Sequence, residues 1–216
     1  MTPRDDLLLT AERLFALHGI DAVSLRRIGV EAGQRNVAAI QYHFGDKTAL
    51  VQAIFDHRLD SVDARRREML ALLCAEGRKH DVHALIDALV RPLAEQAARV
   101  GSHYARFLNR VCEHAGQSLV PLSAIAPVNS AVEIGHLVID ELGALPEPFA
   151  AQRSELAGRM IIAALAELEH RTAVFPRTVP DADLYTLGLV DAVVGLLTAP
   201  VSVPGPSRHP KPISER

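Results

Sequence analysis

Apolar side chains recur at helical spacing along almost the whole chain, and no stretch alternates between apolar and polar residues as a half-buried strand would. Near the N-terminus, for example, Leu7, Leu8, Ala11, Leu14 and Phe15 fall on one face of a helix. The chain has 216 residues, 49% of them hydrophobic, so it can bury a core of useful size. We therefore expect an all-α protein.

The overall charge does not indicate a partner. The formal net charge is -3 at pH 7, so an argument for nucleic-acid binding must rest on local features. Cys74 and Cys112 are too few for a disulfide framework or a four-ligand zinc site. The N-terminus does not read as a signal peptide, and the longest apolar run, 184–197, is too short and too polar to cross a bilayer. We expect a soluble, cytoplasmic protein with no cofactor and no membrane partner.

Capping residues and helix breakers divide the chain into segments. Thr2 and Pro3 suit the start of the first helix, Gly19 suits its end, and Ser24 suits the start of the second. Pro92 is expected to kink the fifth helix. The expected helices span about 3–17, 24–32, 37–43, 47 into the seventies, 81–100, 102–114, 128–142, 147–171 and 181–199.

The stretch 24–47 has the layout of a helix-turn-helix DNA reader, in which the second short helix enters the major groove. Amide and guanidinium groups pair with base edges, alanine contacts a thymine methyl group, and Tyr, His and Lys commonly reach phosphates. The following helix, which opens with Asp46 and Lys47, offers free backbone amides to a phosphate. The outward-facing candidates are Gln34, Arg35, Asn36, Ala38, Ala39, Gln41, Tyr42 and His43.

The local charge supports DNA binding only modestly. Residues 22–47 carry a net charge of +2, from four basic and two acidic side chains. The same pattern also fits an ordinary helical corner whose polar residues face solvent, so the residues alone leave both interpretations open.

Residues 4–55 contain a specific set of motifs: Phe15, Gly19, Ser24-Leu25-Arg26-Arg27-Ile28, Glu31-Ala32-Gly33, Tyr42-His43-Phe44 and Asp46-Lys47-Thr48-Ala49-Leu50. This set resembles the TetR-type transcriptional regulators. The resemblance implies a dimer with a DNA-binding head on a helical, effector-binding body. It also implies that the DNA backbone is held by Ser24, Arg27, Tyr42, His43 and Lys47. The segment 34–41, with Gln34, Arg35, Asn36, Ala39 and Gln41, then faces the bases.

The chain departs from commoner members of this family between Gly33 and Tyr42, where it has one residue more. The turn before the recognition helix is therefore longer. Base contacts at Gln34, Arg35 and Asn36 cannot be carried over by position, whereas the backbone contacts after the insertion can.

The last expected helix is apolar on nearly every side between Leu184 and Leu197, so it must be covered all round. In a chain this short, one side can meet the chain's own core and the other a partner. Small residues at i, i+4, i+7 and i+11 permit a close helix approach, and the preceding helix has a comparable face. We expect a symmetric four-helix homodimer interface, formed by Ser154, Gly158, Ile161, Gly188, Ala192, Gly195 and Ala199. The alternative is a core helix in a monomer.

The helix 102–114 is the expected wall of an effector pocket. Tyr104, Phe107 and Val111 form its apolar stripe, His103 lies at the edge, and other aromatic residues are scarce in the body. A second stripe on this helix is read mainly as a solvated face, with a cationic wall for an acidic ligand as the alternative; it consists of His103, Arg106, Arg110 and His114. His80 and His83 have no evident third partner, so we expect no metal site.

The sequence contains no P-loop, HExxH motif or nucleophile elbow, so we do not expect an enzyme. We expect a helix-turn-helix domain at 1–46, an effector-binding and dimerisation domain at 47–199, and a disordered, proline-rich tail at 200–216. The expected function is a homodimeric repressor that binds a palindromic operator in double-stranded DNA and is released by an unknown small-molecule effector. The alternative is a helical protein-interaction module without DNA readout.

Overall fold

The computed structural model describes residues 2–33, 44–115, 129–143, 145–175 and 181–201. These residues form eight helices and no strand, which confirms the all-α prediction for the described part of the chain. The expected helix 37–43, the loop 116–127 and the tail beyond 201 lie outside the described residues. The helices are α1 (Pro3–His18), α2 (Leu25–Glu31), α4 (Lys47–Ala75), α5 (Val82–Ala97), α6 (Tyr104–Ala115), α8 (Ser130–Leu142), α9 (Glu147–Val174) and α10 (Ala182–Thr198).

The predicted caps at the N-terminal end of the chain are confirmed. Thr2 and Asp5 form a capping box, in which the Thr2 hydroxyl accepts from the Asp5 amide at 3.2 Å and the Asp5 carboxylate accepts from the Thr2 amide at 2.9 Å. Gly19 ends α1 at a φ of 84°, a conformation that favours glycine. Pro92 lies inside α5, which continues to Ala97.

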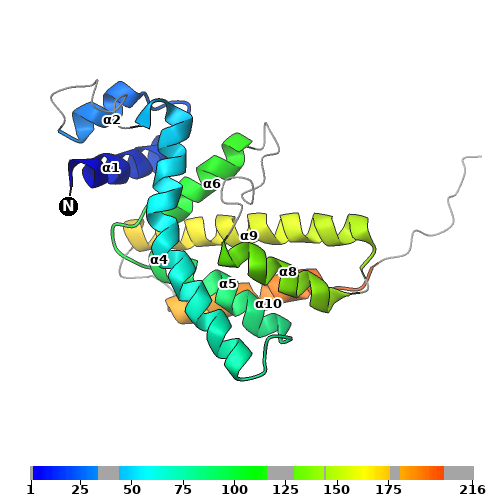
Figure 1. Ribbon diagram of the computed structural model, residues 1–216. Coiled ribbons are helices and arrows are strands. Elements are labelled where there is room, and N and C mark those ends of the chain that lie inside the picture. The colour runs from blue at the N-terminus through cyan, green and yellow to red at the C-terminus, as the bar shows by residue number, and fades with distance from the viewer. Residues whose placement is uncertain (1, 34–43, 116–128, 144, 176–180, 202–216) are drawn as a thin grey trace, which may run out of the picture.

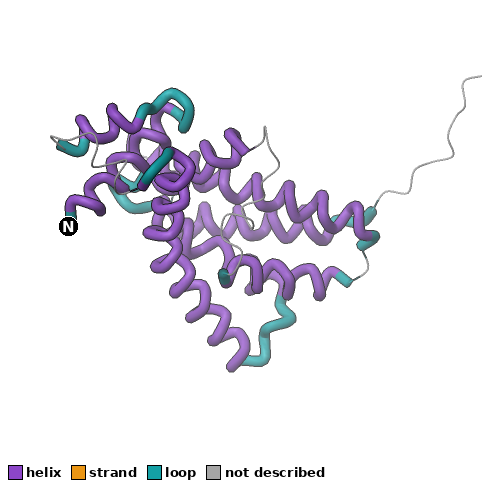
Figure 2. The backbone as a smooth tube through the Cα atoms, turned by 45° about the horizontal axis from the view of Figure 1, so that its top comes forward, coloured by secondary structure: helices purple, strands orange, loops and turns teal. Residues whose placement is uncertain are grey.

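The helices form a small head on a larger body (Figure 1). The head contains α1, α2 and the start of α4. From there α4 extends to the far end of the body, where it packs against α5 and α8, while α9 and α10 lie side by side (Figures 1 and 2). Because α6 packs against both α1 and α9, it connects the head to the body.

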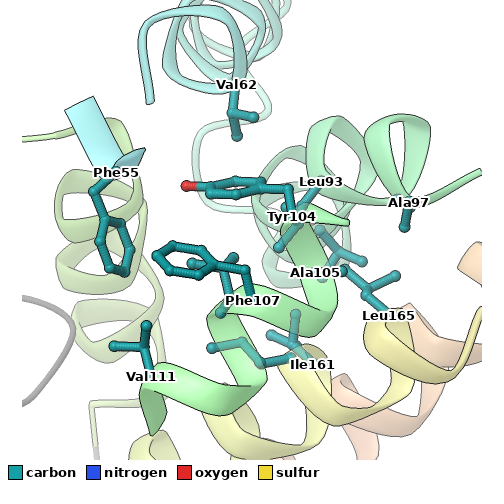
Figure 3. Packing of buried hydrophobic residues seen from close by; sticks show 14 of the residues in the cluster. Phe55, Val62, Leu93, Ala97, Tyr104, Ala105, Phe107, Val111, Ile161 and Leu165 are labelled. Carbon is teal, nitrogen blue, oxygen red and sulfur yellow. The ribbon is translucent and has the colours of Figure 1, made fainter. Parts of the chain in front are cut away.

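One continuous apolar core crosses from the head into the body. Phe107 of α6 is fully buried at its centre, with its ring centroid 6.3 Å from that of Phe15 in α1 and 5.5 Å from that of Phe55 in α4. Figure 3 shows Phe55, Tyr104 and Phe107 gathered around this junction. The head is therefore not an independent unit, because its main helix shares a core with the body.

Two buried carboxylates reinforce the junction. Glu12 of α1 accepts two hydrogen bonds from the Arg58 guanidinium of α4, at 2.6 and 2.8 Å. Glu169 of α9 accepts from the backbone amides of Ala105 and Arg106 at 3.1 and 3.0 Å, and from the Ser102 hydroxyl at 2.7 Å. The Glu169 carboxylate therefore satisfies the first amides of α6, and the Ser102 hydroxyl donates to this carboxylate rather than capping the helix itself.

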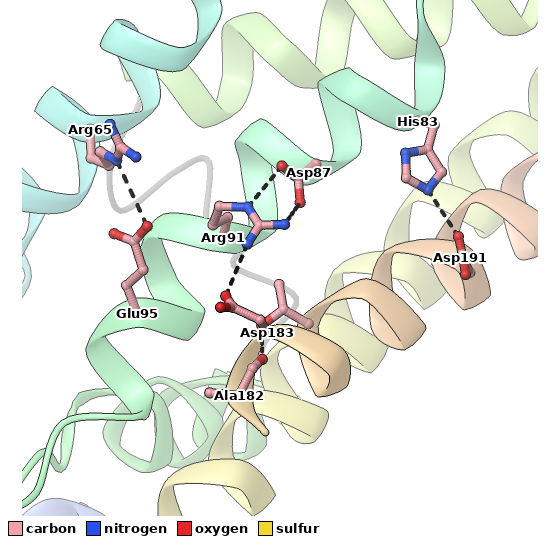
Figure 4. A network of polar contacts seen from close by, with 9 residues as sticks. Arg65, His83, Asp87, Arg91, Glu95, Ala182, Asp183 and Asp191 are labelled. Carbon is pink, nitrogen blue, oxygen red and sulfur yellow. Dashed lines mark hydrogen bonds and ion pairs between the residues drawn. The ribbon is translucent and has the colours of Figure 1, made fainter. Parts of the chain in front are cut away.

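Surface ion pairs align α5 with its neighbours (Figure 4). Arg91 bridges Asp87 at 2.6 Å and Asp183 of α10 at 3.3 Å, and His83 lies 2.9 Å from Asp191 of α10. The His83–Asp191 pair is exposed, and exposed pairs contribute about 0–1 kcal/mol each. They therefore orient helices that the apolar core already holds together.

The next observations concern metal groups, cysteines and membrane-spanning helices, and they hold for the residues that the structure describes. There, no group of three or more His, Cys, Asp or Glu side chains is placed to hold a metal, and His80 pairs with Glu141 at 2.5 Å. Cys74 and Cys112 are both free. No described helix combines the length and the apolar character that a bilayer crossing requires.

Candidate nucleic-acid interface

The start of α2 carries two of the expected backbone contacts. The Ser24 hydroxyl caps the helix by accepting from the Arg27 amide at 3.2 Å. The Arg27 guanidinium donates to Glu31 at 3.1 Å and lies 2.9 Å from the His18 ring. The Arg27 side chain is still 41% exposed, so it is accessible to a phosphate, but it must then exchange an existing partner.

Lys47 lies at the first position of α4 and is partly exposed. Its ammonium group donates to the carbonyl of Ile20 at 2.9 Å and lies 3.4 Å from that of Asp21. Lys47 therefore ties the turn between α1 and α2 to the start of α4. An ammonium group has three donors, so this tie leaves capacity for a phosphate.

The N-terminus of α4 offers further donors. The Asp46 carboxylate caps it by accepting from the Ala49 amide at 2.8 Å. The amides of Lys47 and Thr48 donate to no acceptor within the described segments. First-turn amides are favourable for anions, although the Asp46 charge opposes a phosphate there and Lys47 offsets it.

The remaining expected DNA contacts lie outside the described residues; they are Gln34, Arg35, Asn36, Ala39, Gln41, Tyr42 and His43. The framework on both sides of them is well packed. Ile20, Val23 and Ile28 are buried on one side, Phe44 is buried on the other, and the Arg4 guanidinium lies 5.4 Å above the Phe44 ring. Two buried anchors therefore flank the candidate reading segment.

Residues 7–54 match the family model described as bacterial regulatory proteins, tetR family. This range contains most of α1, all of α2 and the first turns of α4. The chain has a TetR-family N-terminal domain. TetR-family regulators are DNA-binding transcription factors and not enzymes, so this match favours DNA-binding regulation.

Two solved structures extend the similarity of fold to the body of the chain. AmtR from Mycobacterium smegmatis superposes with a TM-score of 0.51 at 17% identity, over 94% of this chain and 89% of that one. A TetR-family regulator from Rhodococcus sp. gives 0.50 at 17% identity, over 88% of this chain and 98% of that one. At such identities the likeness concerns the fold alone. A comparison with curated protein sequences finds no significant match.

The expected effector residues are inside the core. Tyr104, Phe107 and Val111 are 4%, 0% and 4% exposed. His103 donates to the Gly101 carbonyl at 2.9 Å, and burial lowers the pKa of its imidazole below the ordinary value. In the second stripe of this helix, Arg106 pairs with Glu169 and Arg110 with Glu113. The stripe is therefore not an unpaired cationic wall.

A hollow of about 160 Å³ lies elsewhere, between the end of α8, the start of α9 and the end of α10. None of the four expected effector residues lines it. Arg153 in its lining donates to the carbonyls of Leu197 at 3.0 Å and Pro200 at 3.3 Å, and so satisfies the last turn of α10. The hollow is smaller than the ~300–1,000 Å³ of usual ligand pockets.

The small-residue stripe of α10, which consists of Gly188, Ala192, Gly195 and Ala199, is exposed along its whole length in the single chain. The opposite side of α10 is buried. On α9, Ser154 and Gly158 are partly exposed, and Ser154 lines the hollow. Ile161 is only 7% exposed because it packs into the chain's own core, so it offers little surface to a partner, and its place in the dimer interface stays a prediction.

Three polar features of the structure were not expected from the sequence. They are the Glu12–Arg58 pair, the Glu169 cap and the buried arginine Arg66. Glu12 and Arg66 are charged residues, for which the ordinary expectation is exposure to solvent. The available sequence signal for a buried charge is a charged residue with core residues four positions before and after it. Arg66 has this pattern, because Val62 and Leu70 lie four residues on either side of it.

Proposed function

We propose that the chain is a homodimeric repressor of transcription in the cytoplasm. It binds a palindromic operator through two heads and is released when a small-molecule effector binds in the helical body. The observation that carries this proposal is the family match at 7–54, because it falls on the helices that hold the candidate DNA contacts.

The exposed α10 stripe supports the dimer. Leu184 and Leu187 on the same helix are 68% and 44% exposed, and Leu156 and Val174 of α9 are 47% and 50% exposed. Apolar side chains and glycines gathered on two adjacent helices are typical of a helix-packed interface. Two-fold symmetry then places two heads on one DNA duplex, which explains a palindromic operator.

The shared core supports coupling between effector and DNA. Lys47 begins α4 in the head, and the same helix reaches the body core through Val62 and Leu70. A shift of α4 or α6 in the body therefore moves the head. The effector must bind better to the state that does not bind DNA, and typical coupling free energies are about 1–3 kcal/mol.

A mobility-shift experiment with the DNA upstream of the chain's own gene tests the proposal. The expected result is a sequence-specific complex with two subunits per operator, together with weaker, salt-sensitive binding to random DNA. A protein-interaction module instead gives no shift on either DNA at low salt.

We expect Lys47→Ala to weaken binding to operator and random DNA alike. The substitution removes one ammonium group from the backbone contacts, so the slope of log affinity against log salt should fall by roughly one. Affinity measured across a salt series checks this, with Lys79→Ala as the control because Lys79 is exposed beyond the end of α4, away from the head. Equal slopes for the two variants contradict the contact.

We expect Gln41→Ala to act on sequence preference. Gln41 stands among the base-facing positions, and loss of a bidentate amide contact should cost about 1–3 kcal/mol at one or two base pairs. Binding to an operator library reveals which positions lose their preference. A uniform loss over all sequences would assign Gln41 to the backbone instead.

A further inference from the structure

Arg66 of α4 is a buried cation with almost no partners. Its residue is 8% exposed, and its Nε atom donates to the Leu89 carbonyl of α5 at 3.0 Å. Among the described residues, this carbonyl is its one hydrogen-bond acceptor. A guanidinium group has five N–H donors, so most of its capacity is unused.

The acidic groups that act electrostatically on Arg66 and Tyr104 are occupied by other residues. Asp63 interacts electrostatically with Arg66, but its Oδ1 atom accepts from the Ser130 amide at 2.7 Å and from the Ser130 hydroxyl, and its Oδ2 atom accepts from Arg67. Glu12 is held by both arms of Arg58. Burial lowers the pKa of Arg66, as expected for a charge that has lost water without a full replacement.

Tyr104 of α6 provides a second unused donor within electrostatic range of this charge. Its hydroxyl interacts electrostatically with Arg66, and burial raises the pKa of the hydroxyl, so it stays protonated. Its hydroxyl has no hydrogen-bond partner in the described segments. Yet no described side-chain nitrogen or oxygen is both fully enclosed and unpaired. The unpaired Arg66 nitrogens and the Tyr104 hydroxyl are therefore not completely enclosed by the protein.

We propose that Arg66 and Tyr104 bind the carboxylate of an organic-acid effector. The planar guanidinium fork matches a carboxylate in a bidentate geometry, and the tyrosine hydroxyl adds a donor. Val62 and Leu93, which lie near Tyr104 in Figure 3, suit an apolar remainder of the ligand. The inference rests on the proposed function, since it names the class of effector for that regulator.

The position of Arg66 also explains how such a ligand acts on DNA binding. Arg66 belongs to the helix that starts with Lys47, Leu89 belongs to α5, and Tyr104 belongs to the helix between head and body. A carboxylate held by Arg66 and Tyr104 would link α4 to α6. The ligand therefore biases the two helices that carry the head.

The test uses the full chain and three probe acids, hexanoate, decanoate and benzoate, each compared with its neutral amide by titration calorimetry and thermal shift. We expect at least one acid to bind the wild type at least about tenfold more tightly than its amide. Arg66→Met should abolish this difference, and Tyr104→Phe should reduce it. Arg110→Met is the matched control, because Arg110 is an exposed arginine paired with Glu113, and it should behave like the wild type.

Stability separates a ligand contact from a structural role. Arg66→Met should keep or raise the melting temperature, since it removes a buried charge without a paired anion. Acids that bind no better than amides, or a preference that survives in Arg66→Met, overturn the inference. DNA binding by the ligand-free wild type is measured in parallel. If DNA binds and no acid does, the inference fails while the proposed function stands; if an acid binds through Arg66 and no DNA does, the proposed function fails.

Discussion

Replacing Phe107 with alanine is expected to lower the free energy of unfolding by about 3–5 kcal/mol, the usual cost of deleting a fully buried phenylalanine. Phe107 is 0% exposed, and its ring contacts Phe15, Phe55 and Tyr104. The truncation opens a cavity at the point where α1, α4 and α6 meet. We therefore expect operator affinity to fall together with stability, because the head depends on this shared core.

Denaturant unfolding and operator binding measured on the same Phe107→Ala sample check this expectation. Protein concentration must be kept equal between variants, because the apparent stability of a dimer depends on it. Phe149→Ala is the control, since Phe149 is 37% exposed and should cost far less. A stable Phe107→Ala protein that still binds operator and has lost only its response to effector would instead assign Phe107 to the effector pocket.

Local signals explain why the helix boundaries in the head were predictable. Thr2, Ser24 and Asp46 each accept a hydrogen bond from the amide three residues further along the chain. Because both partners lie within four residues of sequence, each helix start can be predicted from that short segment. The end of α1 at Gly19 follows from the same kind of signal, since the turn needs a positive φ. Such features depend on neighbours in the sequence and hardly on the rest of the fold.

Features that join distant segments were not predictable in this way. The Glu169 carboxylate caps α6 from a helix more than sixty residues away, at a separation of 63 from Arg106 and 64 from Ala105. Ile161 shows a related difficulty on α9: helical periodicity marks it as apolar but does not tell whether that face meets the chain's own core or a second subunit. In the single chain Ile161 is 7% exposed, which shows that this position contributes to the chain's own core.

Arg66 combines both difficulties. Its position on α4 predicts a polar contact, but the identity of the partner depends on how α5, α6 and α8 pack around it. In the structure the Asp63 carboxylate accepts hydrogen bonds from Ser130 and Arg67. Within the described part of the chain, Arg66 donates only to one backbone carbonyl, that of Leu89. Because Ser130 and Arg67 already donate to the Asp63 carboxylate, Arg66 has no ordinary ion pair with it. This makes Arg66 a candidate ligand contact.

Gly195→Leu is expected to convert the dimer into a folded monomer. A Cβ atom at Gly195 meets nothing within 4 Å in its own chain, and leucine favours a helix over glycine by about 1 kcal/mol, so the subunit itself should fold. In a close helix contact, however, an added side chain costs about 1–3 kcal/mol. A two-fold interface contains the substitution twice, so the dimer should weaken by about 2–6 kcal/mol.

Operator binding by Gly195→Leu should fall with the dimer, because two linked heads bind one operator far more tightly than a single head does. Sedimentation at micromolar concentration measures the subunit state, and circular dichroism checks that the monomer is folded. Gly135→Leu is the matched control: Gly135 is also a helical glycine, on α8, with nothing within 4 Å of an added Cβ, and it lies outside the α10 stripe. If Gly195→Leu remains a dimer as tight as Gly135→Leu, the stripe faces solvent and the two subunits meet through another surface.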